Sequence, residues 1–313
     1  MALRLATRGS TLALTQAGQV AELLGGAELV EASSDGEPGD KSRFVHGVER
    51  ALLAGEAEVG VHSAKDLPGA IPEELEIAAV PPREDPADVW IGAGSSLADA
   101  PEGARVGTAS LRRRAQLLAA RPDLRVEELH GNVDTRLRKL AEGHLDAIVL
   151  AAAGLRRLGR ESEIGFSIPV EAMVPAAGQG ALALQVRAGD SATIEAVAGL
   201  LDFDAARELT AERAAVALLE ADCTSPIGVH ARVEGERLGI EAFVGLPDGS
   251  EWLRDRVEGE AADPVSAGTL LAERLLSAGA RELLQRVATP GADGPKTPLY
   301  GGKSAHRPTE DED

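Results

Sequence analysis

The sequence predicts an α/β protein with two doubly wound lobes and a small α+β C-terminal domain. Strand-like and helix-like segments alternate through the first and middle thirds of the chain, which is typical of βαβ units around a largely parallel sheet. Short strand-like runs follow two helical patterns near the C-terminus, as expected for an antiparallel sheet. At 313 residues the chain has the length of two or three domains, each able to bury its own core.

The first lobe begins with a strand that leads into a helix. Ser10 is placed to cap this helix, because a serine hydroxyl accepts a hydrogen bond from the free N–H groups of a helix start. The helix should end at Gly25-Gly26, and Ser42 is placed to cap the next one. The expected elements are a strand at 3–7, a helix at 10–24, a strand at 28–32, a helix at 42–53 and a strand at 58–62.

The middle third repeats this order and should form the second lobe. Its expected elements are a strand at 105–107, a helix at 111–120, a strand at 125–129, a helix at 133–142 and a strand at 146–150 that runs into a helix. Proline-bearing stretches at 80–88 and 169–180 bracket the block, and a strand at 181–187 follows the second. If the chain crosses into the second lobe and returns, these two stretches form the hinge.

The last third should lead into the C-terminal domain. We expect helices at 190–201 and 204–219 before Cys223, strands at 227–233, 238–246 and 252–257 with a turn at 247–249 after it, and then helices at 264–278 and 281–287. We therefore expect residues 1–82 and 181–200 in the first lobe, 83–180 in the second with hinge segments at both ends, 201–289 in the C-terminal domain and 290–313 as a disordered tail.

Composition excludes several classes of protein. A net charge of −19 and only 2% aromatic residues argue against a nucleic-acid partner, which needs cationic and stacking groups. No apolar run approaches the roughly 20 residues that cross a bilayer, and the N-terminus lacks the apolar segment of a secretory signal. A single cysteine suits a reducing compartment. We therefore expect a cytoplasmic protein that binds neither nucleic acid nor membrane.

The basic residues are concentrated in the middle third, at 112–114, 136–139 and 156–157. Such clusters in an acidic chain favour a small polyanion bound in a cleft. Thr108 and Ser110 precede Arg112 and Arg113 at a helix start, where free N–H groups and guanidinium groups can bind carboxylate or phosphate. On this segment alone, a solvated helix face is an equal alternative.

The same pattern recurs at other strand ends. Asn132 can cap the helix that carries Arg136, and both helix starts follow strands whose carboxyl ends share one edge of a parallel sheet, where ligands bind. Arg156-Arg157 after the strand at 146–150 is a candidate third contribution, and Arg8-Gly9-Ser10 is its counterpart in the first lobe.

Lys65 and Asp66 also follow a strand. An aspartate in a cleft can act as an acid or base or stabilise a cation, whereas a surface Lys-Asp pair contributes little. Cys223, the only cysteine, lies in a loop-like run and is a candidate nucleophile, covalent anchor or redox sensor, or else a small buried apolar residue. The six histidines lack metal-ligand spacing, so we expect no metal site.

Ordered motifs along residues 3–290 resemble the porphobilinogen deaminase family. They are residues 5–10, 61–66, 83–86, 107–113, 131–136 and 175–181, and Cys223 followed by Pro226-Ile227-Gly228. Each motif is weak alone, but their number and order make chance agreement implausible. The resemblance implies two lobes like those of periplasmic-type binding proteins.

The resemblance also implies a reaction. Members of the family join four porphobilinogen molecules head to tail, release ammonia at each addition, and start from a dipyrromethane held on a cysteine thioether. Cys223 matches that cysteine, and Asp66, with Lys65, matches the catalytic aspartate that stabilises the cationic azafulvene. The matching cofactor-binding residues are Ser63, Lys65, Thr108, Ser110, Arg112, Arg113, Asn132 and Arg136, and the substrate-binding residues are Arg8, Ser10, Gln16, Arg157 and Gln179. Lys41 and Phe44 match a lid. We expect a monomer that takes porphobilinogen as its only partner.

The sequence departs from the family pattern in three ways. His130 replaces the usual arginine, the loop at 33–44 is shortened, and Asp222 and Thr224 flank the cysteine in place of glycine and glutamine. These departures leave open a catalytically silent, hinged anion-binding or regulatory protein on the same scaffold. A thiol hydrolase with His230 as its base is a further alternative.

Overall fold

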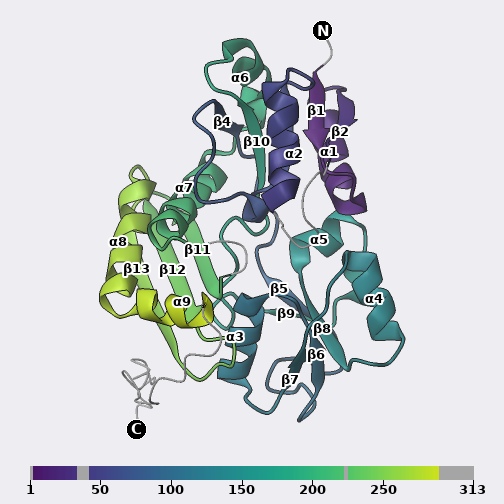
Figure 1. Ribbon diagram of the computed structural model, residues 1–313, viewed down its shortest axis with the longest axis vertical. Coiled ribbons are helices and arrows are strands. Elements are labelled where there is room, and N and C mark those ends of the chain that lie inside the picture. Colours follow the sequence, from purple (N-terminus) through teal and green to yellow (C-terminus); the bar gives the residue numbers. More distant parts are fainter. Residues whose placement is uncertain (1–2, 34–41, 222–224, 289–313) are drawn as a thin grey trace.

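The computed structural model describes residues 3–33, 42–221 and 225–288 (Figure 1). Lys41, Asp222, Cys223, Thr224 and most of the shortened loop lie outside the described residues, as does the tail at 290–313. Phe44 lies in helix α2, but its side chain is not among the described groups.

The first sheet has the strand order β2-β1-β3-β10-β4. Its strands are β1 (Arg4–Thr7), β2 (Glu28–Glu31), β3 (Val59–Ser63), β4 (Leu75–Ala79) and β10 (Leu182–Arg187), and its helices are α1 (Thr11–Leu23) and α2 (Ser42–Leu53). Leu5 packs with α1 on one face and Ala6 with α2 on the other, because neighbouring strand residues point to opposite faces. The sheet is therefore doubly wound, as the sequence predicts.

The second sheet has the order β7-β6-β8-β5-β9. Its strands are β5 (Asp88–Gly92), β6 (Arg105–Gly107), β7 (Arg125–Glu127), β8 (Ala147–Ala151) and β9 (Phe166–Ile168), and its helices are α3 (Leu111–Ala120), α4 (Val133–Ala141) and α5 (Ala152–Arg157). Leu117 of α3 packs with Val149 on one face, and Leu137 of α4 packs with Ile148 on the other. This sheet is doubly wound as well.

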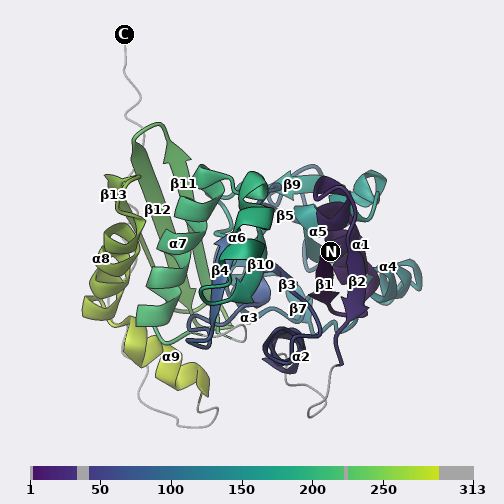
Figure 2. The ribbon, with the colours of Figure 1, turned by 90° about the horizontal axis from the view of Figure 1, so that it is seen from above.

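The C-terminal domain is an antiparallel sheet covered by helices on one face. Its elements are α7 (Phe203–Leu218), β11 (Ile227–Glu234), β12 (Arg237–Gly245), β13 (Trp252–Glu260), α8 (Pro264–Ser277) and α9 (Ala280–Ala288). Helix α6 (Ser191–Val197) packs on the first sheet instead. Helix α7 lies between this domain and the first sheet (Figure 2). Its Ala205 and Leu209 pack toward the first sheet, whereas Ala211 and Ala215 pack toward the C-terminal domain.

The sequence failed to predict three strands. The stretch at 80–88, expected as hinge, gives way to β5 at Asp88, and β4 and β9 were missed because prolines and short lengths hide them. The sheets are also mixed rather than largely parallel, since β10 runs antiparallel to β3 and β4, and β5 runs antiparallel to β8 and β9. The remaining expected elements are confirmed within one or two residues, with two exceptions. The strand expected at 252–257 continues to Glu260, and the helix at 190–201 ends at Val197 and continues as a 3-10 turn, Ala198–Leu200. The domain boundaries given above stay a proposal.

Candidate anion-binding site

Strand β3 ends in a short 3-10 turn, Ala64–Asp66, that presents Lys65 and Asp66. The Asp66 carboxylate accepts a hydrogen bond from Arg8, with 2.9 Å between Oδ2 and Nη1. Asp66 remains exposed, so its carboxylate is accessible to a ligand. Its described ion-pair partner is therefore Arg8, which follows β1, and not the neighbouring Lys65.

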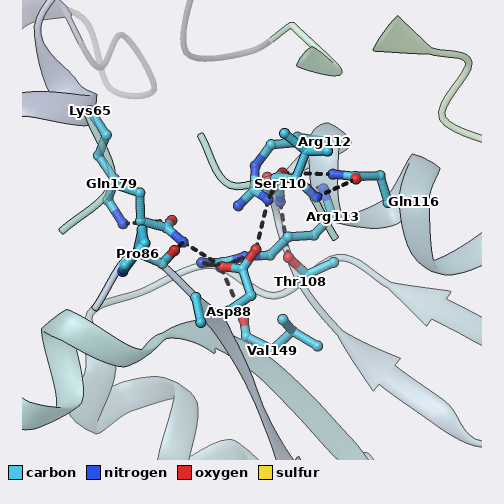
Figure 3. A network of polar contacts seen from close by, with 12 residues as sticks. Lys65, Pro86, Asp88, Thr108, Ser110, Arg112, Arg113, Gln116, Val149 and Gln179 are labelled. Carbon is cyan, nitrogen blue, oxygen red and sulfur yellow. Dashed lines mark hydrogen bonds and ion pairs between the residues drawn. The ribbon is translucent and has the colours of Figure 1, made fainter. Parts of the chain in front are cut away.

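Lys65 points toward the other lobe. Its Nζ lies 3.5 Å from Oε1 of Gln179, and Gln179 in turn donates to the carbonyl of Pro86 at 2.6 Å and to Asp88 at 3.0 Å (Figure 3). Burial lowers the pKa of Lys65 to about 8, and the positive charge of Arg113 contributes to the lowering. This contact brings an ammonium group from the first sheet to the edge of the second.

Helix α3 starts as the sequence predicts, with Ser110 accepting a hydrogen bond from the backbone N–H of Arg113 and Thr108 accepting one from Ser110. Arg112 and Arg113, however, are only 4% and 6% exposed. Both guanidinium groups pair with Asp88, at 2.7 and 2.8 Å. The alternative of a solvated helix face is therefore wrong, because these arginines are buried in an ionic cluster.

Asp88 is the residue that sequence reasoning missed. It is fully buried at the start of β5, and burial alone would raise the pKa of its carboxyl group. The two arginines and the hydrogen bonds that Asp88 accepts outweigh this effect and hold that pKa well below its usual range. The only feature of the sequence that could have pointed to Asp88 is its place as an acidic residue after the prolines of the expected hinge.

Helix α4 is capped by Asn132, whose side chain accepts from the backbone N–H of Thr135 at 2.9 Å. One turn later, the Nε of Arg136 is buried and has no hydrogen-bond partner among the described residues. Burial and the neighbouring charge of Arg113 lower the pKa of Arg136 to about 10. A partly buried guanidinium group near a second one, with no described carboxylate bound to it, is suited to an anionic ligand.

Several other candidate residues already make contacts within the protein. Arg156 pairs with Glu84 and Asp85 at 2.9 and 3.0 Å, and Arg157 donates to the carbonyl of Gly180. The Ser10 hydroxyl caps α1. Gln16 is buried and Ser63 is partly buried.

The structure describes two histidines that bear on the departures from the family pattern and on the hydrolase alternative, His130 and His230. His130 lies 2.7 Å from Glu128, and both side chains are exposed. His230 lies 3.4 Å from the buried carboxylate of Glu212, so it already has an acidic neighbour. Nothing in the described residues relates it to Cys223.

A cavity of about 850 Å³ opens beside the start of α3, between the second sheet and the C-terminal domain. Its lining includes Thr108, Ser110 and Arg114 on one side and Asp248 and Arg286 on the other. Lys65 and Asp66 do not line it. Within the described ranges, no cluster of three or more histidine, cysteine or acidic side chains could hold a metal ion, and no helix is long and apolar enough to span a membrane.

Together the fold and the site define a class, a two-lobed α/β protein with a cluster of mainly cationic side chains, Arg112, Arg113, Arg136 and Lys65, between its two sheets. A family model described as "Porphobilinogen deaminase, dipyromethane cofactor binding domain" matches residues 3–195, and the "Porphobilinogen deaminase, C-terminal domain" model matches residues 206–277. The chain belongs to the porphobilinogen deaminase family.

Curated relatives carry the same name. The porphobilinogen deaminase of Trichlorobacter lovleyi is 43% identical over 91% of this chain and 96% of its own length, and that of Syntrophus aciditrophicus is 44% identical over 91% and 98%. Among solved structures, the chain is similar to the L-cystine solute receptor of Neisseria gonorrhoeae, with a TM-score of 0.38 and 16% identity over 71% of this chain and 94% of that one.

Proposed function

We propose that this protein is a hydroxymethylbilane synthase, which joins four porphobilinogen molecules head to tail and releases ammonia at each addition. Family membership over almost the whole described chain supports the reaction. The observation that carries the site is the partly buried guanidinium group of Arg136, whose buried Nε has no hydrogen-bond partner among the described residues and which lies near Arg113. Each pyrrole brings two carboxylates, which such a group can bind.

The residues present fit a dipyrromethane cofactor. We propose that Cys223 carries it and that Arg112, Arg113, Arg136 and Lys65 bind its carboxylates. The polar side chains at the starts of α3 and α4 and near β3 would add hydrogen bonds; they are Thr108, Ser110, Asn132 and Ser63. When bound, the dipyrromethane supplies the primer to which new pyrroles are added.

The first sheet would supply the carboxylate that stabilises the reacting cation. Asp66 is exposed at the end of β3 and can accept hydrogen bonds from pyrrole N–H groups. Its negative charge favours a cation that forms when ammonia leaves, so it stabilises the transition state more than the ground state. Arg8, Ser10, Gln16, Arg157 and Gln179 are the proposed substrate-binding residues, and Lys41 and Phe44 the proposed lid. We propose that the enzyme acts in the cytoplasm as a monomer.

A silent binding protein is the alternative, and the family comparisons favour the enzyme. Intact-protein mass spectrometry of wild type and Cys223→Ser, with an ammonia-release assay on porphobilinogen, tests the proposal. We expect an added dipyrrole on wild type alone, followed by turnover. If the wild-type protein carries no adduct after incubation with porphobilinogen and releases no ammonia, the result would contradict the proposed enzyme and favour a catalytically silent binding protein.

A further inference from the structure

Asp88 is the central carboxylate of the cluster that contains the proposed cofactor arginines, yet its own position keeps it from touching a ligand. It is fully buried, at the first residue of β5. Its Oδ2 accepts from Arg112 at 2.7 Å, and its Oδ1 accepts from Arg113 at 3.0 Å and from Gln179 at 3.0 Å. Both of its oxygens are therefore used within the protein.

These bonds fix the direction of both arginines. Arg113 is held on two sides, by Asp88 and by the carbonyl of Val149 at 3.0 Å. Arg112 is held through Nη1 alone, which donates to Asp88 and to the carbonyl of Val174 at 2.9 Å. A guanidinium group has five N–H donors in a fixed plane, so anchoring one edge of Arg112 leaves another edge in a set orientation.

The same carboxylate also offsets the repulsion between cations. Arg112 and Arg113 are adjacent in sequence and buried together, and the charge of Arg113 extends to Lys65 and Arg136. Without a buried anion, this set of charges would be costly to hold near one another in a medium of low dielectric constant. Asp88 raises the pKa of Lys65, whereas Arg113 lowers it.

We propose that Asp88 is a positioning residue for the reaction: it holds Arg112 and Arg113 in place for the carboxylates of the bound dipyrrole and, through Gln179, links them to Lys65 of the other lobe. This inference rests on the proposed function. The link through Gln179 joins the two lobes, because Lys65 follows β3 of the first sheet and Asp88 begins β5 of the second (Figure 3).

Asp88→Asn tests the role, because it keeps the shape of the side chain and removes its charge. Asp146→Asn is the matched control, because Asp146 also pairs with an arginine of the same sheet, Arg105, at 2.8 Å. Asp146 immediately precedes β8, whereas Asp88 lies opposite the last residue of β8, at the other end of that strand. Each protein is made without cofactor in cells that cannot produce porphobilinogen. It is then incubated with porphobilinogen, and intact mass is followed over time.

We expect Asp88→Asn to acquire the dipyrrole on the order of 100-fold more slowly than wild type, because misplaced binding groups cost about that much. The small fraction that loads should show the alkaline limb of kcat/KM at lower pH, since removing the Asp88 charge lowers the pKa of Lys65 further. A residue that only stabilised the fold would lower the melting temperature and leave that limb in place. Asp146→Asn should match wild type in both measurements.

The outcomes separate the inference from the function. Wild type that never loads would overturn the proposed function and this inference with it. Wild type and Asp146→Asn that load, together with Asp88→Asn that loads equally fast and keeps its pH profile, would overturn this inference alone. If Asp88→Asn does not fold, Asp88→Glu decides, because it keeps the charge and displaces it by one methylene group; loading and KM at wild-type values in that variant would overturn the positioning role.

Discussion

Asp66 is paired with Arg8 at 2.9 Å, but both side chains remain partly exposed, so the carboxylate can also bind a ligand. Asp66→Asn keeps the hydrogen-bonding shape and removes the charge that would favour a cation. We expect cofactor loading to be largely retained and kcat to fall about 100- to 1000-fold, which is the usual cost of losing one transition-state contact. Intact mass measures loading, and single-turnover ammonia release measures the chemical step; normal turnover would exclude the assigned role.

Lys65 should give the reaction an alkaline limit. Burial lowers its pKa to about 8 from an ordinary value of 10.5, so its positive charge is present below pH 8 and is lost as the pH rises through that value. We expect KM for porphobilinogen to rise above about pH 8, because a carboxylate loses its cationic partner. Lys65→Arg stays charged and should move this limb to higher pH; an unchanged limb in that variant would assign it to another group.

Single residues also show where sequence reasoning ends. Ser110 and Asn132 could be predicted, because capping depends on a few neighbouring residues whose order is visible in the chain. Asp88 could not, nor could the link that Gln179 makes to Lys65, because both depend on partners about 25 to 114 positions away that only the folded chain brings together. The buried carboxylate of Asp88 therefore had no local signature. The family resemblance marks Gln179 only as a substrate-binding residue.

At the scale of elements, the start of α3 joins stability to binding. The Ser110 hydroxyl caps this helix and is also proposed to bind the cofactor. Ser110→Ala should cost about 1 kcal/mol of folding free energy, as for a typical N-cap, and should also slow cofactor loading. Urea unfolding and intact mass measure the two effects.

Asp263→Ala is the control for this prediction, since Asp263 caps α8 in the C-terminal domain by accepting from the N–H of Ser266. It should cost a similar folding free energy and leave loading unchanged. Equal loading defects in both variants would mean that the Ser110 effect reflects stability alone.

Strand β5 shows why some elements escaped prediction. Its five residues follow a run of prolines that is typical of a linker, and the strand is buried on both sides between β8 and β9. Such a strand lacks the alternation of apolar and polar residues that marks a half-exposed one. The helices, with their longer periodic patterns and caps, were predicted within one or two residues, apart from α6, which ends earlier.

At the scale of the whole molecule, the alternation of strands and helices predicted the order of the two lobes along the chain. It did not predict the contacts that join the connecting stretches between the lobes to the C-terminal domain. Glu212 of α7 is fully buried and accepts hydrogen bonds from Arg83 and from the backbone N–H groups of Gly178 and Ala231. These three groups come from the two connecting stretches and from β11. One carboxylate thus ties both connections to the C-terminal domain, a role set by long-range packing that no local pattern reveals.

Removing the charge of Glu212 should therefore weaken the molecule as a whole. Burial would raise the pKa of its carboxyl group, but Arg83, at 2.8 Å, and its other partners keep that pKa below the usual value, so the ionised pair is the native state. Glu212→Gln leaves Arg83 buried without its full counter-charge, since Glu208 lies farther away at 3.2 Å. We expect a loss of about 3 kcal/mol, as for other broken buried ion pairs.

The double variant Arg83→Met/Glu212→Met distinguishes the cost of an unpaired buried charge from the cost of altered side-chain packing. Replacing both charges removes the unpaired guanidinium, so its stability should exceed that of Glu212→Gln, whereas additive losses are expected if the two residues act independently. Glu208→Gln, in the same helix but more exposed, should cost less than either. Urea unfolding followed by circular dichroism ranks the variants, and a Glu212→Gln protein as stable as wild type would show that the junction does not depend on this charge.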